Sequence, residues 1–282
     1  MAALSTYLSF VRVSHTVFAL PFAFTGALLA TRESSPSWAS FVWILVCMVS
    51  ARSAAMGFNR IVDARFDALN PRTANPESPR GALTAQNAWV FVGVAVVVFV
   101  GAAFRISPLC GWLSPLALAI VGWYSLAKRY TYYTQAFLGL AMAVAPVGGW
   151  LAAGGGLSPA PWLLGLAIGL WVAGFDIIYA CQDHGLATGR THVESGRFGV
   201  AGALRLSRVL HVATIVVMAS LALVVPLGPI YLAGVALVAV LLAYEQSIVS
   251  ADDLSRAADA FNLNGYVGIL YMVTTAVAVY GS

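Results

Sequence analysis

The sequence predicts an all-α integral membrane protein with nine transmembrane helices, and three observations support this fold class. Hydrophobic residues make up 60% of the 282 residues and charged residues only 9%, whereas about 25% of the residues in soluble proteins are charged. The apolar residues gather in runs of about 20, the length that crosses a bilayer as a helix. These runs do not show the alternation of membrane β-strands. We therefore expect residues 1–282 to form a single transmembrane domain.

The predicted spans are separated by short turns and by two long polar loops, one after the second span and one after the sixth. The second long loop covers Gln182–Arg208. The predicted spans are His15–Ala30, Trp38–Phe58, Ala88–Phe104, Leu109–Ala127, Thr134–Ala153, Trp162–Cys181, Val209–Val225, Ile230–Ser250 and Phe261–Tyr280.

Basic residues are unevenly distributed between alternate loops. Most of them fall on the side that holds the N-terminus and both long loops, whereas the other side receives only Arg32 and Arg105. Loops rich in lysine and arginine stay in the cytoplasm. We expect a cytoplasmic N-terminus and active face, in a bacterial plasma membrane. The basic pI of about 9.1 then reflects topology and contact with membrane lipids, and we expect no nucleic-acid partner.

The first polar stretch carries Asn59, Asp63 and Asp67 at intervals of four residues. On a helix this spacing stacks the three side chains on one face. Their hard oxygen atoms suit Mg2+, which binds one or two carboxylates together with substrate phosphates. The pattern therefore predicts a site for a metal-bridged diphosphate. The alternative is a set of ion pairs at a wet interface with the arginines nearby, namely Arg60, Arg65 and Arg72.

A second acidic stretch closes the sixth predicted span. Asp176, Tyr179 and Asp183 again fall on one helical face. Asp176 lies within an apolar run, where a charge is costly and is a functional hypothesis by default. The alternative is an acid that forms a salt bridge with Lys128 or an arginine.

Basic side chains that could bind phosphate follow the fourth span. Tyr124 and Lys128 share a helical face and Arg129 is adjacent. A lysine acts on phosphate as a point charge and an arginine as a two-pronged donor. Arg72 and Arg80 could act in the same way. The alternative is the aromatic and basic belt found at the ends of membrane helices.

Several ordered motifs in this chain resemble the UbiA superfamily of membrane prenyltransferases. Asn59-x-x-x-Asp63-x-x-x-Asp67 matches the first acidic motif, and Asn70–Ala74 fits its continuation. Tyr124-x-x-x-Lys128 and Asp176–Asp183 match two further motifs. The opening Arg12–Pro21 is similar to the 4-hydroxybenzoate polyprenyltransferase-like branch, which includes proteins of the futalosine route to menaquinone.

The resemblance implies nine helices around a central cavity, with the two acidic motifs facing each other. It implies transfer of an isoprenyl group from a polyprenyl diphosphate to a small aromatic acid, 4-hydroxybenzoate-like or dihydroxynaphthoate-like, in ubiquinone or menaquinone biosynthesis. The reaction would be Mg2+-dependent and pass through an allylic carbocation. The expected catalytic residues are Asp63, Asp67, Asp176 and Asp183; the expected metal ligands are these four and Asn59; and the expected substrate-binding residues are Asn59, Arg72, Tyr124, Lys128, Arg129 and Tyr179.

Two positions depart from the family pattern. Ala187 stands where the second motif usually has another Asp, and Pro76 stands where the first loop usually has an Arg. They motivate an alternative, a catalytically reduced member that binds polyprenyl diphosphate or quinone precursors without turnover. A third reading is an ion-coupled transporter with Asp176 as the coupling acid. The sequence leaves open the acceptor, the prenyl length and the oligomeric state.

Overall fold

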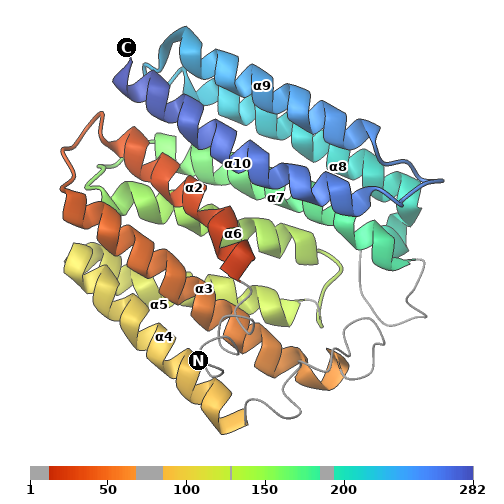
Figure 1. Cartoon of the computed structure of the whole chain (residues 1–282), viewed down its shortest axis with the longest axis horizontal. Coiled ribbons are helices and arrows are strands. Elements are labelled where there is room, and N and C mark those ends of the chain that lie inside the picture. The colour runs from red at the N-terminus through yellow and green to blue at the C-terminus, as the bar shows by residue number, and fades with distance from the viewer. Residues whose placement is uncertain (1–12, 68–84, 128, 185–193, 282) are drawn as a thin grey trace.

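The structure, a computed structural model, describes residues 13–67, 85–127, 129–184 and 194–281, and the side chains of these residues except 13–18, 64–67, 182–184 and 194–198. The described residues form nine α-helices and no strand (Figure 1). The helices are α2 (Val13–Ala30), α3 (Trp38–Asp67), α4 (Ala85–Ile106), α5 (Pro108–Ala127), α6 (Thr134–Ala152), α7 (Ala160–His184), α8 (Glu194–Leu221), α9 (Gly228–Ser247) and α10 (Ala257–Tyr280).

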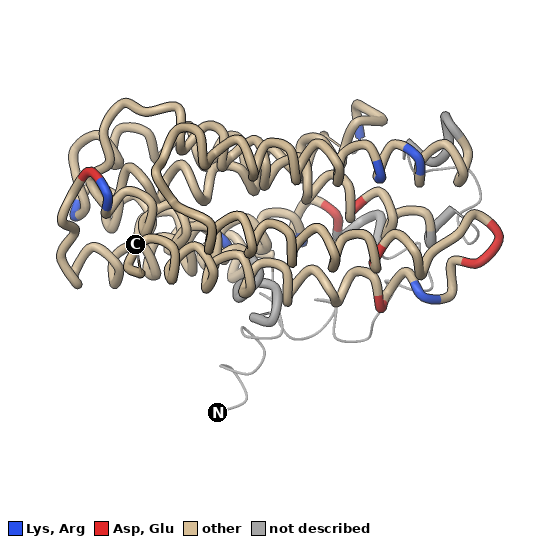
Figure 2. The backbone as a smooth tube through the Cα atoms, turned by 90° about the horizontal axis from the view of Figure 1, so that it is seen from above, with Lys and Arg blue, Asp and Glu red and all other residues tan. Residues whose placement is uncertain are grey.

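The composition of the helices confirms an integral membrane protein. Eight helices of the described chain are long and apolar enough to cross a membrane, and the described apolar part of α2, Ala19–Ala30, is shorter. Figure 2 shows the charged residues gathered mainly toward the two ends of the bundle. A bundle with apolar sides and charged ends suits a bilayer, because charges near the centre of the hydrocarbon are costly.

Helix α7 is the central element of the bundle. It packs against α6 on one side and α8 on the other, and it also contacts α10. Helix α6 packs in turn on α2, while α9 pairs with α10 and α3 pairs with α4 (Figure 1). Two large side chains, Trp150 of α6 and Trp171 of α7, are completely buried in this core. The second acidic motif therefore lies on a helix that is packed between several others.

Close backbone contacts join α2, α6 and α7. A Cβ atom on Gly26 would collide with the carbonyl oxygen of Pro146, and one on Gly149 would collide with that of Ala23. Nearer the beginning of α6, a Cβ on Gly139 would collide with the carbonyl oxygen of Gly169 in α7. Helices in lipid associate through such small residues, because close approach increases van der Waals contact. We call these three contacts the glycine seam.

Several helices extend beyond the predicted spans, α3 and α8 by the greatest lengths. Helix α3 continues from Phe58 to Asp67, so the first acidic motif is helical as its spacing predicted. Helix α7 continues to His184 and helix α8 begins at Glu194, so the prediction of a loop over Gln182–Arg208 is wrong for residues 182–184 and 194–208. The arginines of this segment lower its hydropathy, but Ala203, Leu204 and Ser207 are buried on one face. The segment is an amphipathic helix, with a kink at Gly199, where φ is 67°.

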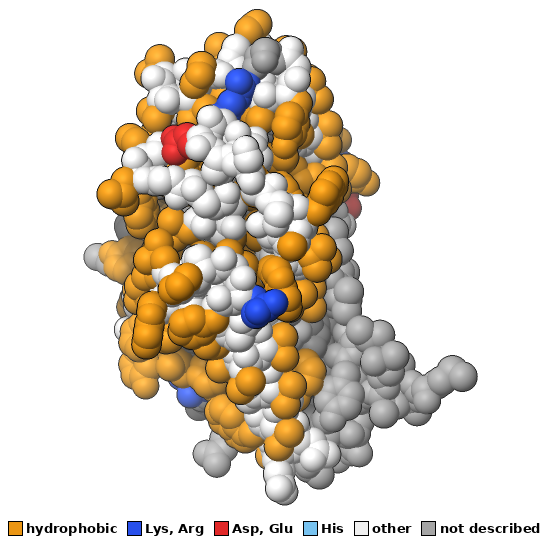
Figure 3. All heavy atoms as spheres, turned by 90° about the vertical axis from the view of Figure 1, so that its left-hand side faces the viewer, with side chains coloured by type: hydrophobic (Ala, Val, Ile, Leu, Met, Phe, Trp, Pro, Cys, Tyr) orange, Lys and Arg blue, Asp and Glu red, His pale blue; other side chains and the backbone are white. Residues whose placement is uncertain are grey.

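The end of the bundle that holds the α2–α3 turn carries few charged side chains, as Figure 3 shows for the left-hand side of Figure 1. Helix ends here are joined by polar contacts. The Arg32 guanidinium donates to the carbonyl oxygen of Ala278 at 3.1 Å, and the Ser34 hydroxyl donates to that of Ala153 at 2.7 Å. This end is therefore closed by contacts between the helices, whereas the acidic motifs lie at the other end.

Candidate active site

The first acidic motif contributes two buried polar side chains near the end of α3. Asp63 is 7% exposed. The side-chain oxygen of Asn59 is buried and has no hydrogen-bond partner among the described residues. Leaving such an oxygen unpaired costs about 1–3 kcal/mol. This unsatisfied acceptor, one turn from a carboxylate on the same face, is a suitable partner for a bound cation.

Arg129, directly beyond α5, is joined to the same part of α3. Its Nη2 atom donates to the carbonyl oxygen of Val62 at 2.6 Å and lies 3.9 Å from Oδ1 of Asp63. The long second distance and the exposure of Arg129 make this a weak ion pair. Asp63 is thus partly neutralised by a guanidinium that can also turn to an incoming anion.

Tyr124 is the residue at which the motifs meet. Its hydroxyl interacts electrostatically with Asp176 of α7 and with Arg52 and Asp63 of α3. These residues come from three helices and are up to 124 positions apart (176 − 52 = 124) in the sequence. The structure therefore brings residues of the first acidic motif, the tyrosine motif and the first residue of the second acidic motif close to one another.

Tyr179 lies one turn beyond Asp176 on α7 and packs on Phe261 of α10, with 5.0 Å between the ring centroids. Both rings are partly exposed. Phe175 contacts the other side of Phe261, at 5.6 Å between centroids. These three rings form an aromatic wall next to Asp176.

Several predicted residues are only partly described or lie outside the description. Asp67 and Asp183 have helical backbones, at the end of α3 and near the end of α7, but their side chains are not described. Arg72 and Lys128 lie outside the described residues, as do the two departures from the family pattern, Pro76 and Ala187. Their roles stay predictions.

Arg52 is a polar residue of this site that the sequence analysis did not identify. It lies seven residues before Asn59 and eleven before Asp63, which places all three on one face of α3. Its Nε atom is buried and has no hydrogen-bond partner among the described residues. The signal was present in the sequence, because an arginine inside an apolar run of this length is a functional hypothesis by default.

The described donors fit a hard divalent cation. No three His, Cys, Asp or Glu side chains within the described part of the chain are placed to hold a metal. Asp63 and Asp176 nonetheless both interact with Tyr124, and the buried amide oxygen of Asn59 belongs to the residue one helical turn before Asp63. Mg2+ needs few carboxylates when a substrate phosphate supplies further oxygens. The residue set suits a cation that arrives with a phosphate ligand.

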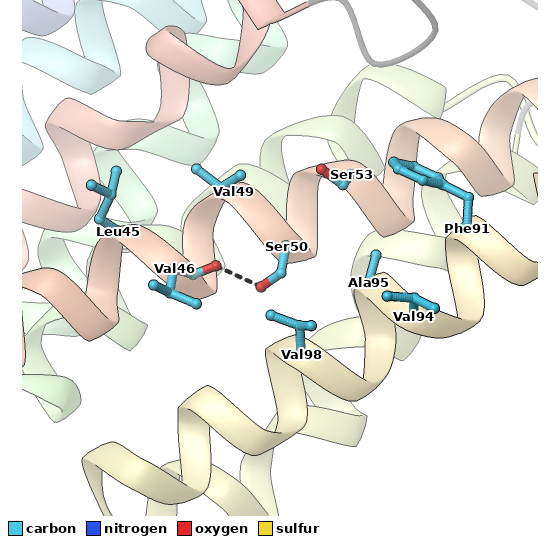
Figure 4. Close-up of a pocket in the computed structure, with 9 residues that line it drawn as sticks. All are labelled: Leu45, Val46, Val49, Ser50, Ser53, Phe91, Val94, Ala95 and Val98. Atoms are coloured by element: carbon cyan, nitrogen blue, oxygen red, sulfur yellow. Dashed lines mark hydrogen bonds between the residues drawn. The ribbon is translucent and has the colours of Figure 1, made fainter. Parts of the chain in front are cut away.

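A separate apolar groove of about 370 Å³ lies between α3 and α4 (Figure 4). It contains no charged side chain. The hydroxyl of Ser50 donates to the carbonyl oxygen of Val46 at 2.6 Å, so it is satisfied within its own helix. The groove offers contact to hydrocarbon and not to a diphosphate. The central cavity implied by the resemblance stays a prediction, because residues outside the description belong to its expected rim.

The fold and the site together define a helical membrane protein that gathers carboxylates, an amide and guanidinium groups at one end of its bundle. Residues 19–268 match the UbiA prenyltransferase family. The chain therefore belongs to this family and is a prenyltransferase, and the resemblance noted in the sequence is confirmed.

Individual relatives cover nearly the whole chain. It is 28% identical to the 4-hydroxybenzoate octaprenyltransferase of Cupriavidus necator over 98% of this chain and 97% of that one, and 29% identical to that of Vibrio parahaemolyticus over 90% and 89%. A UbiA homologue from Aeropyrum pernix K1, solved in the apo form, is 33% identical, with a TM-score of 0.84 over 93% of this chain and 97% of that one. A UbiA homologue from Archaeoglobus fulgidus, bound to GPP and Mg2+, is 17% identical with a TM-score of 0.69 over 97% and 99%, and shows the shared fold.

Proposed function

We propose that this protein transfers an isoprenyl group from a polyprenyl diphosphate to a small aromatic acid, of the 4-hydroxybenzoate or dihydroxynaphthoate type, in quinone biosynthesis. The observation that carries the proposal is the meeting of Asp63, Arg52 and Asp176 around Tyr124. Opposite charges placed together on two membrane helices, around a tyrosine of a third, suit a ligand that carries both a metal ion and an anion. The names of the two bacterial relatives support an aromatic acceptor.

The two acidic motifs would hold the diphosphate through Mg2+. On this proposal Asn59, Asp63 and Asp67 supply ligands from α3, and Asp176 and Asp183 supply them from α7. The cation would neutralise charge on the departing diphosphate. The buried, unpartnered oxygen of Asn59 supports this assignment, since a bound cation would satisfy it.

The guanidinium groups would bind the anionic parts of the substrates. Arg129 is exposed, bonds the carbonyl oxygen of Val62 and lies 3.9 Å from Asp63; on this proposal it turns to the diphosphate when the carboxylate engages the cation. Arg52 is buried deeper along α3, where it can meet either a phosphate oxygen or the carboxylate of the aromatic acid. Arginine presents paired donors that match both groups.

The reaction would then proceed by ionisation and attack. The allylic C–O bond breaks, its electron pair leaves with the diphosphate, and a ring carbon of the acceptor attacks the allylic carbocation. Loss of the proton from that carbon restores aromaticity. The wall of Phe175, Phe261 and Tyr179 would exclude water from the cation and offer it π-faces.

The end of the bundle that holds the site would face the cytoplasm of a bacterial cell. Among the described residues, Arg129, Arg205, Arg208 and Arg256 lie at this end, whereas Arg32 and Arg105 lie at the other. The bias follows the positive-inside rule. Both substrates would then reach the site from the cytoplasmic leaflet.

The test is prenyl transfer by the purified protein in lipid nanodiscs, with a radiolabelled isoprenyl diphosphate, Mg2+ and a panel of aromatic acids. We expect a labelled aromatic product with one acid, and none after chelation of the metal. Asp63→Asn should lower the rate by about a hundredfold or more, the scale of removing one preorganised group from a site of developing charge.

Asp252→Asn is the matched control, because Asp252 is an exposed acid of the α9–α10 turn and its loss should leave the rate unchanged. Product formed at the wild-type rate by Asp63→Asn would contradict the proposal. Diphosphate binding without product from any acid would favour the non-catalytic alternative motivated by Pro76 and Ala187.

A further inference from the structure

A row of buried polar groups joins three helices behind the aromatic wall. Asn264 of α10 is completely buried. Its Oδ1 accepts from Trp171 Nε1 of α7 at 2.8 Å, and its Nδ2 donates to Oε1 of Glu245 of α9 at 3.0 Å and to the carbonyl oxygen of Ala260 at 3.0 Å. The indole N–H can only donate, so the amide oxygen must face Trp171 and the amide nitrogen must face Glu245. The Asn264 amide can therefore make both hydrogen bonds in only one of its two flipped orientations.

The aromatic wall begins at this polar row. Trp171 contacts Phe175 at 5.1 Å between ring centroids, Phe175 contacts Phe261 at 5.6 Å, and Phe261 contacts Tyr179 at 5.0 Å. Trp171, Phe175 and Tyr179 follow one another at intervals of four on one face of α7. Phe261 enters from α10, three residues before Asn264. Asn264 thus holds Trp171, which contacts the wall at Phe175, and it lies on the helix that supplies Phe261 to the wall.

Burial of a carboxyl group at the position of Glu245 is unfavourable for the stability of the fold. It is 1% exposed, and its Oε2 atom has no hydrogen-bond partner among the described residues. A buried carboxyl in a membrane helix is expensive, and apolar residues of similar volume usually stabilise such a position as well or better. Stability alone therefore gives no reason for a carboxyl here, whereas the orientation of Asn264 does.

We propose that Glu245 and Asn264 are positioning residues for prenyl transfer, which fix Trp171 and Phe261 and thereby the ring of Tyr179 beside Asp176. The inference rests on the proposed function. Neither residue contacts the substrates. Glu245 fixes the orientation of the Asn264 amide. Asn264 in turn fixes the Trp171 indole and the register of α10 on α7. Through their ring contacts, these positions fix those of Phe175, Phe261 and Tyr179. A fixed wall excludes water while the allylic cation exists, so loss of order should release the prenyl group as prenol.

Two substitutions of Glu245 distinguish the effect of its hydrogen bond with Asn264 from the effect of its side-chain size. Glu245→Leu removes the acceptor, whereas Glu245→Gln keeps an oxygen that can accept from Asn264 and adds a donor. We expect Glu245→Leu to lower kcat by about tenfold to a hundredfold, the scale reported for a small displacement of positioning groups. KM for the isoprenyl diphosphate should stay unchanged and the share of prenol should rise. Glu245→Gln should restore kcat and the product ratio.

Tyr271→Phe is the matched control for loss of a buried polar contact. Tyr271 is completely buried in α10 and its hydroxyl bonds that of Tyr231 at 2.7 Å, away from the aromatic wall. The Tyr271→Phe variant should have a lower thermal stability, with kcat and the share of prenol unchanged. If Glu245→Leu does not fold, Trp171→Phe removes the indole donor, together with part of the buried ring, and carries the same expectation.

A readout that needs no activity distinguishes this inference from the proposed function. In protein labelled with 3-fluorotyrosine, the 19F resonance of Tyr179 is assigned by its absence in Tyr179→Phe. Glu245→Leu should shift or broaden it, and Glu245→Gln and Tyr271→Phe should not. A wild-type protein that transfers no prenyl group overturns the proposed function. A Tyr179 resonance that Glu245→Leu and Trp171→Phe both leave unchanged, or that Tyr271→Phe alters equally, overturns the positioning role.

Discussion

Arg52 places a positive charge inside a membrane-spanning helix, and its neighbours explain why the charge is tolerated. It lies on the same face of α3 as Asn59 and Asp63, and it interacts with Tyr124 of α5. Charges at membrane depth pair with one another or line a substrate pathway. The buried Nε atom without a partner among the described residues indicates that part of its donor capacity is reserved for a ligand.

We predict that Arg52→Gln lowers kcat/KM for prenyl transfer by about tenfold to a hundredfold, because a hydrogen bond to a charged group contributes about 1.5–3 kcal/mol. Arg52→Lys should retain part of the activity, since lysine keeps the positive charge but lacks the paired N–H donors of the guanidinium. Arg105→Gln is the control, because Arg105 lies at the opposite end of the bundle over the Trp43 ring. Steady-state kinetics with each substrate varied would check this. Full activity in Arg52→Gln would refute a ligand-binding role.

At the residue scale the sequence predicted side chains that share one helical face. Asn59 and Asp63 follow a spacing of four on α3, and the family motifs drew attention to Asp63, Tyr124 and Asp176, which interact in the structure. The Trp171–Asn264–Glu245 row could not be predicted in this way. Its members are separated by 93 and 19 positions, and no spacing rule links side chains that meet only when three helices pack. Arg52 was missed because it lies inside a span, away from the loops that topology rules examine.

Helix packing depends on places where a side chain is absent. In the glycine seam, Gly26 and Gly149 face backbone carbonyl groups across the α2–α6 interface, and Gly139 faces Gly169 across α6–α7. Backbone cannot yield as a flexible side chain can, so these contacts fix the distances between the helices. Helix α6 thereby holds α2 close to α7, which carries Asp176.

We predict that Gly149→Ala destabilises the protein by about 1–3 kcal/mol or more, the cost of overpacking a well-packed contact. Gly93→Ala in α4 is the matched control, because a Cβ there would meet nothing within 4 Å and alanine is the better helix former. Thermal unfolding in detergent would measure both. Equal melting temperatures for the two variants would show that α2 and α6 can separate without cost.

At the element scale, helix positions were predictable because apolar runs of about 20 residues are unambiguous. The start of α8 was not, since an amphipathic extension buried on one face has the hydropathy of a loop. The kink at Gly199 also interrupts the helical periodicity of this segment.

The molecule as a whole is polarised from one end to the other. Helix α10 ends at the end of the bundle that holds the α2–α3 turn, away from the acidic motifs (Figure 1). The described basic residues concentrate at the end that holds the site. This asymmetry was readable from the sequence, because it depends on counting charges in loops and not on packing.

We predict that the C-terminus lies outside the cytoplasm. Fusion of alkaline phosphatase after residue 281 should give active enzyme in a bacterial host, and fusion of a green fluorescent protein at the same place should stay dark. Fusions within the α9–α10 turn, at Asp252, should give the reverse pattern. Fluorescence from the C-terminal fusion would mean that the positive-inside rule fails for this chain and that the site faces the other way.

The length of α3 links catalysis to the lipid around it. A helix of 30 residues is about 45 Å long, whereas the hydrocarbon core of a bilayer is about 30 Å thick. We expect the surplus to lie at the end that carries Asn59, Asp63 and Asp67, with the carboxylates in the headgroup layer and the rest of the helix among acyl chains, because charges in hydrocarbon are costly. A thicker membrane would draw these groups into hydrocarbon, and a thinner one would expose the aromatic wall to water. The acyl-chain composition of the host membrane therefore sets the working depth of the site.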